Sequence, residues 1–300
     1  MKQKTFWNGV VPALTTPFAA DGSVDHAFLA KHSGMMMDAG CTGIVALGSL
    51  GETATLSAAE KKAVLETVVK AVGKRGAVVA GIAALSTGEA VALAKVAEQA
   101  GCAGLMVLPP YVYSSDWREM KHHVASVIGA TGLGCMLYNN PIAYKTDFLP
   151  AQVAELASAH ANLHAVKESA GDVRRVTAIR HLLGARLDVL VGMDDVLVEG
   201  IAAGAVGWIA GLVNALPRES VRLVELARRG PSPELDALYQ WFLPLLVLDT
   251  VPKFVQLIKL VQEKVDRGSA RVRAPRLALE GAELAAAERV IAHALAHRVL

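Results

Sequence analysis

Residues 43–72 read Gly-Ile-Val-Ala-Leu-Gly-Ser-Leu-Gly-Glu-Thr-Ala-Thr-Leu-Ser-Ala-Ala-Glu-Lys-Lys-Ala-Val-Leu-Glu-Thr-Val-Val-Lys-Ala-Val, and this stretch indicates the fold most directly. Its first six residues are apolar or glycine without polar alternation, which is typical of a strand buried on both faces. Ser57 and Glu60 have the spacing of a capping box, which satisfies free backbone N–H groups where a helix begins. The apolar residues at positions 64, 65, 68, 69 and 72 then share one helical face. The stretch therefore predicts a buried strand followed by an amphipathic helix.

The same pairing recurs along the chain, roughly once every 30 residues, which is the size of a βα unit. The predicted strands are residues 10–15, 43–48, 77–82, 104–109, 134–139, 163–167, 187–192 and 207–211. Further capping boxes begin at Ser86 and Asp116, and Gly101 and Gly230 stand where helices end. These units predict an α/β fold, a (β/α)8 TIM barrel over residues 1–225, with an appended C-terminal helical region over residues 226–300. Within that region we expect residues 268–280 to form a loop.

The composition is that of a protein with a large apolar core. Hydrophobic residues make up 53% of the 300 residues and charged residues only 19%, the reverse of a disordered chain. The net charge of +2 and the scattered basic residues argue against a nucleic-acid or membrane partner. Three dispersed cysteines and no visible signal peptide favour reduced thiols. We therefore expect a soluble, cytoplasmic protein.

Lys167 is the residue at a strand end with the most specific chemistry. In this type of barrel the carboxyl ends of the strands surround the active site, and Lys167 closes the predicted strand 163–167. Burial there disfavours the ammonium form, and a neutral amine can attack a carbonyl carbon to form a Schiff base. The alternative is a structural ion pair between Lys167 and Glu168 or another acid.

Two further groups stand at other strand ends. Tyr138 is placed to relay protons to an intermediate on Lys167, and the alternative is a core tyrosine bonded to a backbone carbonyl. Residues 48–51, Gly-Ser-Leu-Gly, let backbone N–H groups approach an anion, so Ser49 and its neighbouring amides are candidates for binding a carboxylate. A plain strand-to-helix turn is the alternative for this segment.

Metal and phosphate sites are less well supported. Asp194 and Asp195 follow the seventh strand, where they would repel a phosphate, and strands three to five do not end in acids. His293 and His297 have ligand spacing on a helix, but no third ligand is in view. We expect no metal site.

Four motifs occur in order along the chain: residues 9–17, Gly-Val-Val-Pro-Ala-Leu-Thr-Thr-Pro; 48–52, Gly-Ser-Leu-Gly-Glu; 138–141, Tyr-Asn-Asn-Pro; and 166–169, Val-Lys-Glu-Ser. Together they resemble the dihydrodipicolinate synthase / N-acetylneuraminate lyase family over almost the whole chain. The resemblance implies a class I mechanism without metal or organic cofactor, in which a lysine forms a covalent Schiff base with a small 2-oxo acid.

The resemblance also assigns roles to individual residues. Lys167 would attack C2 of a 2-oxo acid or an equivalent cyclic imine, and Tyr138 would relay protons. Ser49 would belong to that relay and would hold the substrate carboxylate together with the amide of Leu50. The remaining implied substrate-binding residues are Gly48, Gly51, Asn140, Ile209 and Ala210, with the backbone carbonyl of Ile209 facing the site.

The resemblance further implies an assembly. Family members are usually homotetramers, built as dimers of dimers, in which a tyrosine after the fourth strand enters the neighbouring site. Tyr111 and Tyr113 are the candidates for that tyrosine here.

Three departures from the family pattern bear on the substrate. Lysine-pathway members have threonine where this chain has Leu50, a second tyrosine where it has Val112, and arginine where it has Ala143. That arginine binds the carboxylate of the second substrate or product. Its absence should weaken recognition of a second carboxylate by a few kcal/mol, unless Lys145 replaces it.

Residues 48–52, 138–144 (Tyr-Asn-Asn-Pro-Ile-Ala-Tyr) and 248–250 (Leu-Asp-Thr) are similar to family members of hydroxyproline breakdown. They favour a Δ1-pyrroline-4-hydroxy-2-carboxylate deaminase, which converts a cyclic imino acid into 2-oxoglutarate semialdehyde and ammonia. One alternative is 4-hydroxy-tetrahydrodipicolinate synthase, which condenses pyruvate with aspartate semialdehyde. Others are a 2-keto-3-deoxy sugar acid aldolase or dehydratase and, from another class, a non-catalytic ligand-binding barrel.

Overall fold

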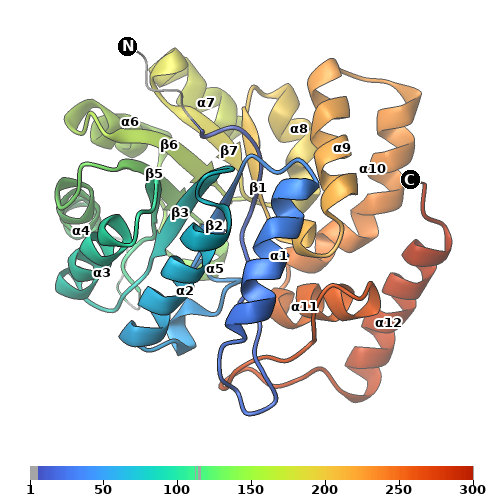
Figure 1. Ribbon diagram of the computed structural model, residues 1–300. Coiled ribbons are helices and arrows are strands. Elements are labelled where there is room, and N and C mark those ends of the chain that lie inside the picture. Colours follow the sequence, from blue (N-terminus) through green and yellow to red (C-terminus); the bar gives the residue numbers. More distant parts are fainter. Residues whose placement is uncertain (1–5, 112, 114–115, 300) are drawn as a thin grey trace.

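Eight parallel strands form the centre of the molecule (Figure 1), a computed structural model that describes residues 6–111, 113 and 116–299. The strands are β1 (Gly9–Pro12), β2 (Gly43–Ala46), β3 (Ala77–Ile82), β4 (Gly104–Val107), β5 (Gly134–Asn139), β6 (Leu163–Glu168), β7 (Asp188–Val191) and β8 (Gly207–Ala210). All eight predicted strands are confirmed. Most end one to three residues earlier than predicted, because the following residues already belong to the loops at the carboxyl ends.

The sheet closes on itself. Its order runs from β1 through β8, β7, β6, β5, β4 and β3 to β2. At the seam between β1 and β2, the N–H of Thr42 donates to the carbonyl of Val10 (2.9 Å) and the N–H of Leu14 donates to that of Val45 (2.8 Å). Every residue of β1, β2, β4 and β8 is buried, as expected where helices cover one face and the barrel interior covers the other. The predicted (β/α)8 TIM barrel is thus confirmed.

Helices surround the barrel in the expected alternation. They are α1 (His26–Asp38), α2 (Ala58–Val72), α3 (Thr87–Gln99), α4 (Trp117–Gly129), α5 (Pro141–Tyr144), α6 (Pro150–Ala159), α7 (Arg174–Leu183), α8 (Leu197–Ala202) and α9 (Pro217–Arg229). Ser57 begins α2 with both halves of the capping box. The side chains of Ser86 and Asp116 accept the N–H of Glu89 and Glu119. These three helix starts lie where the sequence predicts them.

The last 70 residues add three helices to the barrel. These are α10 (Pro233–Leu246), α11 (Phe254–Lys264) and α12 (Gly281–Ala296), which lie on the side of the barrel covered by α9 (Figure 1). Residues 268–280 contain no helix or strand, in agreement with the predicted loop. The division that we predict between residues 225 and 226 falls within α9 and remains a prediction.

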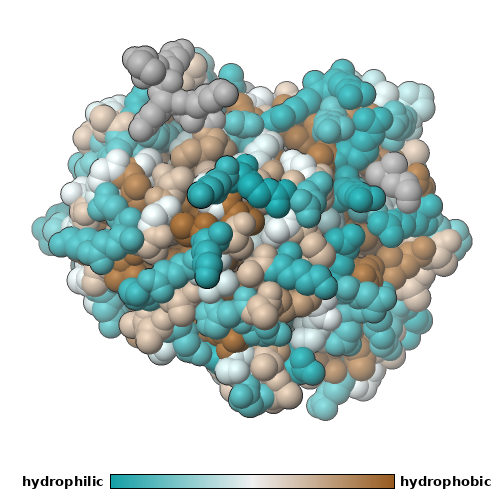
Figure 2. Space-filling model, viewed as in Figure 1, coloured by the Kyte–Doolittle hydropathy of each residue, from teal (hydrophilic) through white to brown (hydrophobic). Residues whose placement is uncertain are grey.

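Hydrophilic residues are spread between smaller apolar areas on the face seen in Figure 2. Among the described residues, no helix combines the length and the apolar character needed to cross a membrane.

Candidate active site

A cavity of about 520 Å³ opens at the carboxyl ends of the strands. All three predicted catalytic residues, Lys167, Tyr138 and Ser49, line it. The predicted substrate-binding residues that line it are Gly48, Leu50, Tyr111, Asn140 and Ile209. The structure therefore brings these sequence-distant residues together, because parallel strands in a barrel end at the same rim.

Three other predicted residues lie elsewhere. Gly51 packs behind the cavity wall, where the Thr16 hydroxyl donates to its carbonyl (2.6 Å). Ala210 follows Ile209 on β8, so its side chain points to the opposite face, and its carbonyl accepts the N–H of Ala13 (2.8 Å). Tyr113 is 56% exposed and lines a separate hollow. Val112 lies outside the described residues.

Lys167 is buried at the end of β6, with only 6% of its surface exposed. The register pairs it with Tyr138 on β5, and its Nζ lies 4.2 Å from the centre of the Tyr138 ring. Burial lowers the pKa of Lys167 to about 8, and the nearby acids Asp249 and Asp194 oppose that shift. A useful fraction of the amine is therefore neutral near neutral pH.

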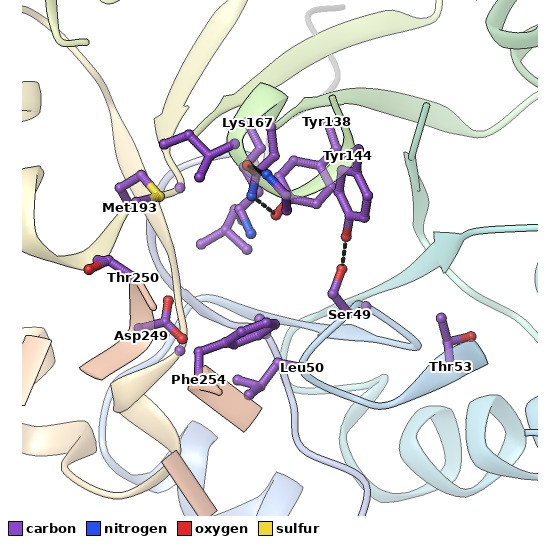
Figure 3. Close-up of a pocket in the computed structure, with 18 of the residues that line it drawn as sticks. Ser49, Leu50, Thr53, Tyr138, Tyr144, Lys167, Met193, Asp249, Thr250 and Phe254 are labelled. Atoms are coloured by element: carbon purple, nitrogen blue, oxygen red, sulfur yellow. Dashed lines mark hydrogen bonds between the residues drawn. The ribbon is translucent and has the colours of Figure 1, made fainter. Parts of the chain in front are cut away.

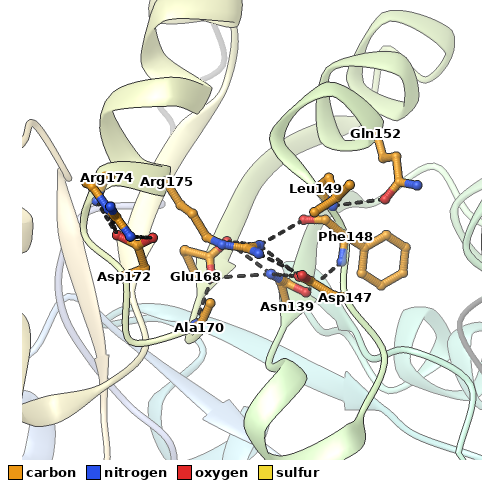
Figure 4. Close-up of polar contacts among 10 residues, drawn as sticks. All are labelled: Asn139, Asp147, Phe148, Leu149, Gln152, Glu168, Ala170, Asp172, Arg174 and Arg175. Carbon is orange, nitrogen blue, oxygen red and sulfur yellow. Dashed lines mark hydrogen bonds and ion pairs between the residues drawn. The ribbon is translucent and has the colours of Figure 1, made fainter.

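Glu168 does not pair with Lys167, although it is the next residue. Side chains alternate along a strand, and Glu168 points away from the cavity toward α7 (Figure 4). There it accepts hydrogen bonds from the Asn139 amide (3.1 and 3.2 Å) and the Ala170 N–H (2.8 Å), and Arg175 lies 4.0 Å away. The alternative of a Lys167–Glu168 ion pair is therefore wrong. Burial raises the pKa of Glu168 to about 7.

Gly192 makes room for the Lys167 side chain. A Cβ at this position, just after β7, would lie 2.6 Å from the Cε of Lys167 and 1.9 Å from the Oγ of Ser169. Neither distance is possible between real side chains, so only glycine is compatible with this placement of the amine.

A chain of hydroxyl groups continues from Tyr138. Its ring meets Tyr144 edge-on with ring centres 5.8 Å apart, and the Tyr144 hydroxyl shares a hydrogen bond with Ser49 (Figure 3). Tyr111 packs on Tyr144 at 5.3 Å. Burial raises the pKa of Tyr138 to about 12, so it remains a neutral phenol at physiological pH. The sequence alone gives Tyr144 no role, although Tyr144 is the last residue of the motif at 138–144.

Asn140 positions this group of tyrosines. Its carbonyl oxygen accepts the N–H of Ala143 (2.9 Å) and so caps α5, which carries Tyr144. Its amide nitrogen donates to the hydroxyl of Tyr138 (3.0 Å). One side chain thus links the strand-end tyrosine to the helix that presents the second one.

The turn after β2 is conformationally strained. Leu47 and Glu52, which flank residues 48–51, both have left-handed backbones, with φ of 62° and 53°. Such conformations are costly for residues other than glycine and concentrate at functional sites. The strain supports a binding role for this turn over a plain strand-to-helix connection.

Two acids lie on the side of the cavity opposite Ser49 and Tyr144, one in the wall and one behind it. Asp249 lines the cavity from the turn Val247–Asp249, before α11. Asp194 lies fully buried behind Gly211 and accepts hydrogen bonds from backbone N–H groups and from Trp208. Residues 248–250 belong to the resemblance, but the resemblance gives Asp249 no role. Only the path of the C-terminal chain places Asp249 in the cavity.

The C-terminal region also supplies a cation to the cavity. Arg276, from the loop before α12, is among the lining residues, and it lies 4.0 Å from the carboxylate of Glu52. Its place in the site could not be read from the sequence, since it is 109 residues away from Lys167.

No three His, Cys, Asp or Glu side chains are grouped to hold a metal ion in residues 6–111, 113 and 116–299. The expectation of a reaction without metal or organic cofactor remains a prediction.

Comparison with known proteins assigns the chain to a family. The model of the dihydrodipicolinate synthetase family matches residues 7–294. The chain belongs to this family. Members of the dihydrodipicolinate synthetase family are class I lyases and aldolases that form Schiff bases, so the protein is an enzyme of that class.

Named relatives agree with this assignment. The chain is 32% identical over 289 residues to 4-hydroxy-tetrahydrodipicolinate synthase of Rhizobium meliloti (strain 1021), covering 96% of this chain and 98% of that one. It is 31% identical to the enzyme of the same name from Citrifermentans bemidjiense, covering 93% and 96%. Its fold matches the family member YagE of E. coli K12, solved in complex with pyruvate, with a TM-score of 0.90, 27% identity and coverage of 97% and 99%.

Proposed function

We propose that this dihydrodipicolinate synthetase family enzyme is a lyase or deaminase that binds a small 2-oxo or cyclic 2-imino acid through a Schiff base to Lys167. The observation that carries the proposal is the buried amine of Lys167, which lies against Tyr138 in the cavity and whose pKa burial lowers to about 8. The neutral amine adds to C2 of the substrate. Loss of water from a 2-oxo acid, or release of the ring nitrogen from a cyclic imine, then leaves the protonated imine.

Proton transfer during these steps is assigned to Tyr138, with Ser49 and Tyr144 extending the relay. Tyr138 lies beside the amine, and its neutral phenol can give a proton to the departing group and later recover it. The hydrogen bond between Ser49 and Tyr144 continues the chain of hydroxyl groups along the cavity wall. We assign the substrate carboxylate to the Ser49 hydroxyl and the amide of Leu50.

Our preferred substrate is Δ1-pyrroline-4-hydroxy-2-carboxylate, which the enzyme would convert to 2-oxoglutarate semialdehyde and ammonia. Leu50 and Ala143 both line the cavity, so its wall carries an apolar side chain and a methyl group where lysine-pathway enzymes bind polar groups of the second substrate. A compact substrate with one carboxylate suits such a wall. Among the described residues that line the cavity, Lys167 and Arg276 are the only cations.

The second candidate is 4-hydroxy-tetrahydrodipicolinate synthase, and the names of the relatives favour it. In that reaction Arg276 would have to bind the carboxylate of aspartate semialdehyde. It would replace the arginine that lysine-pathway members have at the position of Ala143. Two assays separate the two candidate functions. One measures turnover of pyruvate plus aspartate semialdehyde, and the other measures ammonia release from the hydroxylated pyrroline carboxylate. Efficient condensation would overturn our choice of substrate and leave the Schiff base in place.

The Schiff base itself is tested by incubation with pyruvate and borohydride, followed by intact mass and peptide mapping. We expect one reduced adduct on Lys167, and none in Lys167→Ala. Lys95→Ala, an exposed site on α3, is the matched control and should form the adduct as the wild type does. No adduct in the wild type, or an adduct on another lysine, would exclude the mechanism and leave the non-catalytic barrel.

We also propose that the enzyme works in the cytoplasm as a homotetramer, as the family resemblance implies. Tyr111 lines the cavity of its own chain, whereas Tyr113 and Leu85 are both exposed and line the same separate hollow, which makes Tyr113 the better candidate for a subunit boundary.

A further inference from the structure

Asp249 is an acid that lines the active-site cavity and has one oxygen without a hydrogen-bond partner among the described residues. Among the described residues, its Oδ1 is buried and has no hydrogen-bond partner. In Figure 3 the side chain lies across the cavity from Ser49 and Tyr144. Lys167 therefore has the tyrosine relay on one side and Asp249 on the other.

The backbone leaves space for this carboxyl group. A Cβ at Gly211 would lie 2.0 Å from the Oδ1 of Asp249, so any other residue at this position would displace the acid. The same Gly211 gives its N–H to Asp194 (3.1 Å). The two carboxyl groups thus contact the same glycine.

The hydrogen bonds of Asp194 decide which acid carries a proton. Asp194 accepts from the indole of Trp208 (2.8 Å) and the backbone N–H of Leu212 (2.8 Å) as well as from Gly211. These donors favour its ionised form, whereas no such donor to Asp249 is found among the described residues, and the contact with Asp194 favours the protonated form of Asp249. Two adjacent buried carboxyl groups do not readily ionise together, so the proton stays on Asp249.

The charges around Asp249 support this distribution. Burial raises the pKa of Asp249 well above its usual range, Asp194 and Asp195 raise it further, and only Lys167 opposes the shift. Burial also raises the pKa of Asp194, to about 6, but the groups that donate hydrogen bonds to Asp194 limit the change.

We propose that Asp249 is the catalytic acid that removes a hydroxyl group from the Schiff-base intermediate, on the side of the cavity away from Tyr138. This inference deepens the proposed function and rests on it. A substrate with a hydroxyl two carbons from the imine carbon needs a proton donor at that hydroxyl, separate from the relay that serves the imine nitrogen and C3.

The step balances without a further reactant. Loss of a proton from C3 gives an enamine, whose electron pair then forms the C3=C4 bond as the C4–O bond breaks. Asp249 gives its proton to the departing oxygen, which leaves as water, and becomes a carboxylate. That carboxylate then takes a proton from C5, which restores the acid, while the tyrosine relay returns the proton to C3, so that the double bond now lies between C4 and C5. A proton then moves from the C5 nitrogen to C4, which gives the C5 imine. Hydrolysis of the resulting C5 imine and of the Schiff base, with two waters, releases ammonia and the oxo-aldehyde.

The test compares Asp249→Asn with the wild type in two assays. In the variant, reduced adduct should still form with pyruvate, within a few-fold of the wild-type rate, because that step needs no acid at C4. Ammonia release from the hydroxylated pyrroline carboxylate should fall about 10²- to 10⁴-fold, the usual contribution of a general acid. Borohydride added with this substrate should trap an adduct that retains the C4 oxygen in the variant and has lost it in the wild type.

The control is Asp236→Asn, an exposed acid on α10, which should match the wild type in both assays. If Asp249→Asn does not fold, Asp249→Ser is used in its place. Wild-type ammonia release in the variant would overturn the proposal, as would equal loss of pyruvate trapping in a folded variant, since that would show a structural role. Failure of the wild type itself in both assays would instead overturn the proposed function, and this inference with it.

Discussion

Lys167 illustrates how a common side chain acquires unusual chemistry from its location. An exposed lysine is almost entirely protonated at neutral pH, and such an amine cannot attack a carbonyl carbon. At the end of β6 the ammonium form loses its hydration, and two nearby acids restore only part of that cost. Burial also raises the pKa of both acids, that of Asp194 to about 6 and that of Asp249 well above its usual range.

The rate of Schiff-base formation should therefore depend on pH around the lowered pKa of Lys167. The neutral fraction of the amine grows as pH rises, so trapping by pyruvate and borohydride should accelerate from pH 7 and level off above about 8. At pH 7 roughly one-tenth of such an amine is neutral, against less than about one part in a thousand for an ordinary lysine. Single-turnover trapping rates between pH 7 and 10 provide the measurement.

Tyr138 should not contribute to this profile, since its pKa of about 12 lies above the range. A midpoint near the ordinary lysine value, or a rate that does not change with pH, would contradict the assignment of a desolvated amine.

Neighbouring strands determine where the amine points. The carbonyl of Glu168 on β6 accepts the N–H of Gly192 (2.9 Å), which holds the end of β7 directly beside Lys167. No side chain at 192 is compatible with the packed lysine and with Ser169. The contact between these two strand ends is therefore as important to the site as the lysine itself.

Gly192→Ala should reduce pyruvate trapping about 10²-fold, because a displacement of the reacting group by about 1 Å has effects of this size. It should also lower stability by about 1–3 kcal/mol through overpacking. Trapping rates and urea unfolding provide the two measurements.

Gly88→Ala is the matched control, since Gly88 is exposed on α3 with nothing within 4 Å of an added Cβ. It should leave both quantities near the wild-type values. Full trapping activity in Gly192→Ala would mean that Lys167 reaches its substrate from a different position.

Across the whole molecule, a buried ion pair fastens the C-terminal region to the barrel. Lys259 on α11 bonds to Glu52 (2.6 Å) in the turn after β2, and both side chains are almost fully buried. Its ammonium also donates to the carbonyls of Thr16 (2.8 Å) and Arg271 (2.7 Å). The ammonium group of Lys259 thus bonds both to the strained turn and to the loop that carries Arg276.

Lys259→Met should lower the free energy of unfolding by about 3–5 kcal/mol, because the buried Glu52 carboxylate then keeps only the more distant Arg276, 4.0 Å away, as a cation. Adding Glu52→Leu should recover part of that loss, since no charge then remains buried. Unfolding in urea measures both variants, and limited proteolysis within residues 268–280 reports the loosened loop.

Lys253→Met removes an equally short but exposed pair with Glu283 and serves as the comparison. An exposed pair contributes at most about 1 kcal/mol, so this variant should be nearly as stable as the wild type. Equal losses in the two variants would contradict the role assigned to burial.

Much of this architecture follows from local patterns. The strands, the helix starts at Ser57, Ser86 and Asp116, and the loop at 268–280 were predictable because burial and capping leave periodic signals in the chain. Lys167, Tyr138 and Ser49 could be expected to meet because the ends of parallel strands share one rim. The family, too, could be identified from motifs at those ends.

Contacts between distant segments left no such signal. The Tyr144–Ser49 bond, the cavity positions of Asp249 and Arg276, and the need for glycine at 192 depend on how the loops and the C-terminal helices pack against the barrel. The direction of Glu168 away from Lys167 also required the strand to be placed between its neighbours. Periodicity and capping act over a few residues, whereas these features depend on atoms from separate elements coming within a few ångströms, and only the folded chain decides that.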